Sequence, residues 1–182
     1  MKKKVIVAIA AAALLIALVT GGVAFLSSSG YILPGYIEWQ ERFLCCDGYD
    51  IVLKKKHLEV YKDAELVWEL SHDVKVQDVI ITDVDRDGVS EMTVLCWKKG
   101  RYGKYKPVTE TEENATDDKI YAEHIFLYNL TENGPEPKWM ASDIGETVIG
   151  IETPNGYILR THEEDGDVSE WMWVSWGFTK VK

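Results

Sequence analysis

Residues 76–97 read VQDVIITDVDRDGVSEMTVLCW, two β-type runs joined by an acidic loop at residues 83–91. The loop has carboxylates at alternate positions 83, 85 and 87, followed by Gly88 and a fourth carboxylate at Glu91. Oxygen ligands at alternate positions of a tight loop converge on one point, and the glycine permits the sharp turn. The spacing therefore predicts a site for one hard cation between two strands. The alternative is a solvated acidic turn without a metal.

The residues around the loop favour a structural calcium ion over a helix–loop–helix sensor. Position twelve of the loop is Val94, where an EF-hand has a bidentate glutamate, and β-branched runs flank the loop. The expected calcium ligands are the side chains of Asp83, Asp85 and Asp87, the backbone carbonyl of Val89, and Glu91 directly or through water.

The amino-terminal residues indicate the compartment. Three lysines follow Met1, and residues 5–26 then form an apolar run of 22 residues without a charge. That length spans a bilayer as a helix, whereas a signal peptide usually has a shorter apolar region. We expect residues 1–26 to anchor the chain in the cell membrane in a single pass, with the lysines in the cytoplasm and the carboxyl-terminal domain outside. The alternative is cleavage near Ala24 and secretion.

The charge of the remaining chain limits its partners. Residues 1–26 contain three lysines and no acids, so residues 27–182 have 17 basic and 30 acidic residues and a net charge of −13. This balance argues against nucleic acid and anionic lipid as general partners. It is compatible with calcium binding.

Short β-type runs separated by turn residues predict an all-β domain over residues 50–182, after a linker at residues 27–49. Within the linker, residues 27–30 read as flexible, and residues 36–44 fit a brief helix or a strand. The expected strands lie at 50–54, 57–62, 65–70, 75–82, 92–97, 120–130, 147–152, 157–161 and 168–174.

The domain contains an internal repeat. HLEVY at residues 57–61 matches HIFLY at 124–128, and each copy continues to a tryptophan and then to an apolar run. The two repeats cover about residues 50–105 and 120–180. In the second copy the acidic loop aligns with residues 153–157, which lack its carboxylates, so only one copy could hold a metal. Two copies of a sheet-forming unit suggest stacked or radially arranged sheets.

Segment 76–97, with HLEVYKDAELVWEL at residues 57–70 before it, resembles the blade repeat of VCBS/FG-GAP-type calcium-binding β-propellers. The resemblance is good over residues 50–105 and weak over 120–180. It implies blade-like antiparallel sheets, in a partial or small β-propeller-like arrangement, with calcium bound between consecutive strands of a blade. The chain has room for about three such sheets, fewer than a closed propeller needs, and open sheet edges would permit an oligomer.

Two further segments are candidate ligand-binding sites. Lys98, Lys99, Arg101 and Tyr102 begin a basic loop that could dock an anionic cell-wall polymer, or could balance the acidic run at residues 110–118. Trp171 and Trp173 share one face of a strand, which suits either a core or a platform for sugar rings.

The sequence contains none of the common catalytic motifs, such as GxSxG, HExxH or a phosphate loop. Three cysteines are too few for a disulfide scaffold; we expect Cys96 to be a buried thiol, the alternative being a bridge to Cys45 or Cys46. We expect a binding or assembly role at the cell surface, with a wall polymer or a membrane protein as partner. The alternatives are a glycan-active hydrolase using carboxylate catalysis and an inert spacer.

Overall fold

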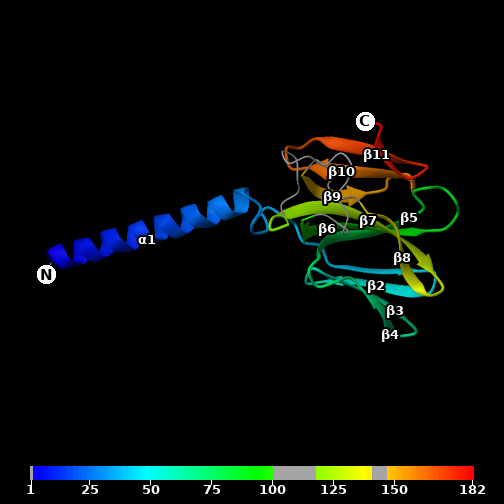
Figure 1. The fold of residues 1–182 in the computed structure, drawn as a ribbon, viewed down its shortest axis with the longest axis horizontal. Helices are drawn as coiled ribbons and strands as arrows, with labels where there is room; N and C mark the ends of the chain where they lie inside the picture. Colours follow the sequence, from blue (N-terminus) through cyan, green and yellow to red (C-terminus); the bar gives the residue numbers. More distant parts are fainter. Residues whose placement is uncertain (1, 101–117, 141–146) are drawn as a thin grey trace.

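The computed structural model describes residues 2–100, 118–140 and 147–182, and this part of the chain contains one helix and twelve strands (Figure 1). The helix is α1 (Lys2–Ser28). The first sheet has the order β1 (Arg42–Cys46), β2 (Tyr49–Lys54), β3 (His57–Lys62) and β4 (Glu65–Glu69). The second has the order β5 (Lys75–Thr82), β6 (Glu91–Lys99), β7 (Tyr121–Thr131) and β8 (Gly134–Met140). The third is formed by β9 (Val148–Glu152), β10 (Ile158–Glu163), β11 (Val168–Val174) and β12 (Gly177–Lys180). Each sheet is an antiparallel meander in chain order.

The three sheets lie against one another as layers, with the sheet of β5–β8 in the middle (Figure 1). One apolar cluster fills the space between the first and middle sheets, where Ile51 and Leu58 meet Val79 and Phe126. A smaller cluster joins the middle sheet to the third, where Leu95 meets Leu159. The middle sheet is therefore buried on both faces, which accounts for its near-continuous apolar strands.

The first strands of the three sheets are neighbours, because β5 packs beside both β1 and β9. Polar side chains join them. Arg42 of β1 makes a bidentate ion pair with Asp78 of β5, at 2.9 and 3.0 Å. Gln77 of β5 donates to the carbonyl of Val148 in β9 at 3.2 Å and accepts from the indole of Trp97 at 2.7 Å.

The internal repeat corresponds to equivalent strands of two sheets. Its matching segments are β3 and β7, the third strands of the first and middle sheets. The register is the same in both copies: Trp68 lies opposite Val60, Trp139 lies opposite Leu127, and a β-bulge follows each pair. The boundaries of the sequence repeat therefore differ from the boundaries of the sheets, because each copy ends in the first strand of the next sheet.

The predicted all-β domain of antiparallel sheets is confirmed, and the strands at 57–62, 75–82 and 168–174 have the expected bounds. Three strands were not expected: β8, β12, and β1, whose segment was left open between a helix and a strand. All three lie at sheet edges. In β8, Pro135 and Pro137 argue against a strand, but an edge tolerates proline because one side of the strand needs no donors. The β structure begins at Arg42, inside the segment expected to be a linker.

Helix α1 extends away from the sheets (Figure 1). Within the described residues it is the one helix long and apolar enough to cross a membrane, with a mean hydropathy of 2.0 over Ala11–Ser28, and a signal sequence meets the same criterion. Ser27 and Ser28, expected to belong to a flexible linker at residues 27–30, instead continue the helix. Gly30 then accepts a 2.7 Å hydrogen bond from the amide of Tyr121, the first residue of β7.

Arg42→Ala is expected to lower the free energy of unfolding by about 3 kcal/mol, because it leaves the buried Asp78 carboxylate without its cationic partner. The Asp78 side chain is 4% exposed. Chemical denaturation measures the change. The matched control is Arg160→Ala, which removes two ion pairs to Glu152 and Glu170 on a more exposed face and should lower the free energy of unfolding much less, because solvent screens exposed ion pairs. Equal losses for both variants would contradict the prediction.

Candidate metal site

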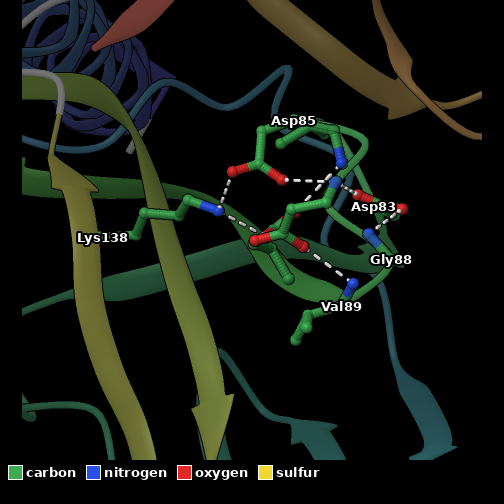
Figure 2. A network of polar contacts seen from close by, with 8 residues as sticks. Asp83, Asp85, Gly88, Val89 and Lys138 are labelled. Atoms are coloured by element: carbon green, nitrogen blue, oxygen red, sulfur yellow. Dashed lines mark hydrogen bonds and ion pairs between the residues drawn. The ribbon is translucent and has the colours of Figure 1, made fainter. Parts of the chain in front are cut away.

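The acidic loop joins β5 to β6, and its four carboxylates converge (Figure 2). One oxygen from each of Asp83, Asp85, Asp87 and Glu91 lies within 4.8 Å of all the others. Glu91 is fully buried, Asp83 and Asp85 are partly buried, and Asp87 is exposed. The four side chains that the spacing selected are therefore brought together, with the deepest one at the start of a buried strand.

Hydrogen bonds from the loop's own amides shape it (Figure 2). Asp83 accepts from the amides of Asp87 and Gly88, at 3.1 and 3.0 Å. Asp87 in turn accepts from the amide of Val89 at 2.8 Å. The carbonyl of Val89 as a ligand stays a prediction.

The backbone of the loop has two residues in the left-handed region, Arg86 at a φ of 64° and Gly88 at 88°. Glycine reaches this region without the penalty that a Cβ imposes. The guanidinium of Arg86 lies over the ring of Tyr157, 5.1 Å from its centroid, in the equivalent turn of the third sheet.

The site also contains a cation from a distant part of the chain. Lys138 of β8 places its Nζ 2.5 Å from Asp85 Oδ2 and 2.6 Å from Glu91 Oε1. The other carboxylate oxygen of Glu91 accepts from the amide of Val84 at 3.0 Å. Both oxygens of this buried carboxylate are thus satisfied.

The electrostatics of the pair follow from burial and contact. Burial raises the pKa of Glu91, while hydrogen bonds from Lys138 and from the amide of Val84 oppose that shift. Burial also disfavours the charged ammonium, but the hydrogen bonds to Asp85 and Glu91 outweigh it and raise the pKa of Lys138. The lysine is therefore a charged partner of the loop at neutral pH.

Sequence reasoning missed Lys138, although the repeat contains a signal for it. Lys138 is the extra residue of the β7–β8 bulge, and Val67 is the extra residue of the equivalent β3–β4 bulge. A β-bulge redirects a side chain. At the equivalent bulge position the first sheet has Val67 and the middle sheet has Lys138. The middle sheet is also the sheet whose first hairpin contains the acidic loop.

The donor set fits a calcium ion. Calcium takes hard oxygen ligands at about 2.3–2.6 Å, so two oxygens on opposite sides of one ion are about 5 Å apart. The four carboxylate oxygens lie within 4.8 Å of one another, which is compatible with this geometry. Asp83, Asp85, Asp87 and Glu91 would hold the ion, and the ion would supply positive charge to a loop that carries an excess of acids.

A second acidic group forms at the hairpin between β10 and β11, within the second repeat. It consists of Glu163, Asp165 and Asp167, of which the two aspartates are exposed. Glu163 accepts a hydrogen bond from the hydroxyl of Ser169, and Asp165 accepts one from the amide of Asp167. These contacts account for the hairpin without a ligand.

The basic loop is described only at its beginning. Lys98 and Lys99 end β6, and Arg101 and Tyr102 lie outside the described residues. Lys98 Nζ lies 3.8 Å from Asp73 Oδ2, and Lys99 lies over the ring of Tyr121. Both lysines contact their own domain, and docking of an anionic polymer stays a prediction.

The terminal tryptophans face the middle sheet. Trp171 donates to the hydroxyl of Thr161 at 3.0 Å and packs against the smaller apolar cluster. Trp173 makes edge-to-face contacts with Trp139 and Phe178, at centroid distances of 6.2 and 5.5 Å. These contacts favour the core interpretation over a sugar platform.

The three cysteines are free. Cys96 is buried, as predicted, and burial raises the pKa of its thiol well above the ordinary value. Cys45 is exposed on β1, so the alternative of a bridge to Cys96 is not found.

Comparison with known proteins found no match: no family model, no curated protein and no solved structure matches this chain.

Gly88→Ala is expected to reduce the free energy of unfolding by about 1–2 kcal/mol, because alanine pays a steric penalty at positive φ. Space is not the cause, since a Cβ at Gly88 would meet nothing within 4 Å. Gly35→Ala is the matched control, because that site is also open and its φ is not positive. Thermal melts of both variants test the prediction, and an unchanged melt for Gly88→Ala would refute it.

Proposed function

We propose that this chain is an extracytoplasmic β module, anchored in the membrane by α1, whose β5–β6 loop binds one calcium ion. The observation that supports it best is the convergence of four carboxylates within 4.8 Å around the fully buried Glu91. The ion would have a structural role, because it would fix the connection between two strands of the middle sheet.

Charge supports a cation at this loop. Four carboxylates and Arg86 lie within residues 83–91, and Arg86 is directed to Tyr157 of the neighbouring turn. Lys138 contacts two of the four carboxylates. The loop therefore keeps a negative charge that a divalent ion would offset, on a domain that is acidic as a whole.

The resemblance to VCBS/FG-GAP-type blades supports the same proposal. Each sheet is a four-stranded antiparallel meander, and the first strands of the sheets are neighbours, as the inner strands of propeller blades are. We infer a binding or assembly role at the cell surface, with a wall polymer, a membrane protein or a second copy as the partner.

Within the described residues, only the abundance of carboxylates supports the hydrolase alternative. The groove at the β11–β12 hairpin, with a volume of about 290 Å³, is lined by Val174, Ser175, Trp176, Gly177, Phe178 and Thr179. None of these side chains can serve as the acid or the base of a glycosidase.

Calcium at 5 mM is expected to raise the melting temperature of the full-length chain in detergent. For a dissociation constant of about 0.1–1 mM, typical of extracellular modules, the stabilisation is about 1–2 kcal/mol or ~2–8 °C. Magnesium at the same concentration should have a much smaller effect, because it dehydrates reluctantly and demands a tighter geometry. A melt that calcium leaves unchanged would contradict the proposed site.

The matched pair of variants is Asp87→Ala and Asp47→Ala. Both residues precede a glycine of positive φ in the first hairpin of their sheet, but only Asp87 belongs to the converging group. Asp87→Ala should reduce the calcium-induced shift strongly, whereas Asp47→Ala should keep it. Equal shifts in the two variants would place calcium elsewhere.

Retention of α1 is expected when the chain is expressed in a bacterial membrane, because its apolar run is longer than that of a typical signal peptide. Intact mass spectrometry should give the full 20.7 kDa chain in the membrane fraction. A product that begins after Ala24 and is found in the medium would support the secreted alternative.

A further inference from the structure

We propose that Lys138 is a tethered counter-cation that competes with calcium for the acidic loop and so sets the calcium concentration at which the loop responds. The inference rests on the proposed function, because it concerns the regulation of the same site. It adds a residue from β8 that lies outside the loop.

Lys138 contacts the acidic loop directly. The Lys138 ammonium lies 2.5 Å from Asp85 and 2.6 Å from Glu91, so it uses an oxygen from two of the four carboxylates that would hold calcium (Figure 2). Its side chain is 14% exposed. A cation at this depth holds the buried Glu91 in place when no calcium is bound.

The backbone of β8 directs the side chain of Lys138 towards the loop. Lys138 is the bulged residue of the β7–β8 pair, and a bulge re-aims the side chain that it carries. The same bulge in the first sheet carries Val67, which is 43% exposed, and the hairpin loop of that sheet has one carboxylate, Asp47. The lysine and the acidic loop therefore occur together in one sheet.

The ammonium of Lys138 also has a second partner outside the loop. Lys138 Nζ also lies over the ring of Trp173 in the third sheet, 5.8 Å from the centroid. Aromatic faces attract ammonium groups. When calcium takes the oxygens of Asp85 and Glu91, the lysine can move towards this ring and keep a favourable contact.

Charge determines the direction of the effect. A single positive charge a few ångströms from a divalent ion repels it, and its removal should strengthen binding by about tenfold or more. The same removal leaves Asp85 and Glu91 without a cation in the calcium-free state. The calcium-free protein should then melt at a lower temperature, and the calcium-induced shift should be larger than in the wild type.

The test compares three variants of the full-length chain in detergent. Lys138→Gln removes the charge and keeps a hydrogen-bond donor for Glu91, so that the variant can fold. Lys138→Arg keeps the charge, and Lys54→Gln removes a charge from an exposed site on β2. Calorimetric titration with calcium chloride gives the dissociation constant, and melts in chelator and in calcium give the shift.

A second readout follows the lysine itself. Reductive methylation with peptide mass spectrometry measures the reactivity of each lysine. We expect Lys138 to be protected in chelator and to become more reactive when calcium displaces it, whereas Lys54 should react equally in both conditions. This readout does not depend on the stability of any variant.

The expected result is tighter binding by Lys138→Gln, with Lys138→Arg and Lys54→Gln close to the wild type. If calcium binds the wild type and Lys138→Gln equally or more weakly, the competition is refuted and the calcium site stands. If calcium binds only Lys138→Gln, the competition is supported and calcium stabilisation of the wild type is refuted. If calcium binds neither protein, both proposals fail. Unchanged protection of Lys138 in saturating calcium would also refute displacement.

Discussion

Strand β6 is buried from Glu91 to Trp97, and the arrangement of the domain depends on this burial. A strand buried on both faces must have a sheet on each side, because neither face can be left to water. The first and third sheets supply that cover. The constraint also reaches the acidic loop, since the strand begins with a carboxylate that is removed from water and needs a cationic or hydrogen-bonding partner there.

The interior strands could be predicted from the sequence, while three of the edge strands could not. Segments such as β3 and β11 contain enough branched and apolar residues for the pattern to fix their bounds. An edge strand pairs on one side and is partly exposed, so it tolerates proline and polar residues that an interior strand would not. Strand β8 contains two prolines and β12 has only four residues, so neither shows the alternation of apolar and polar residues that would identify a strand in the sequence.

In the candidate site, the residues that are close together in the sequence could be predicted, whereas the residue that comes from a distant strand could not. The four carboxylates lie within nine residues, and their alternate spacing was enough to predict their convergence. Lys138 lies 47 residues after Glu91 in the chain, and its position depends on a bulge between two other strands. No local sequence pattern predicts such a contact. Comparison of the two repeats at their bulges is the signal that points to it.

The hydrogen bond between Gly30 and Tyr121 fixes where the acidic loop lies relative to α1. Tyr121 pairs with Lys99 at one end of β6, and the loop begins at the other end, so one strand separates the loop from the helix. Figure 1 shows the loop on the far side of the sheets. A strand of this length spans about 27 Å, more than three Debye lengths at physiological ionic strength. With α1 in a bilayer, the surface potential of the lipids is therefore screened before it reaches the loop, which would experience the calcium concentration of the bulk medium.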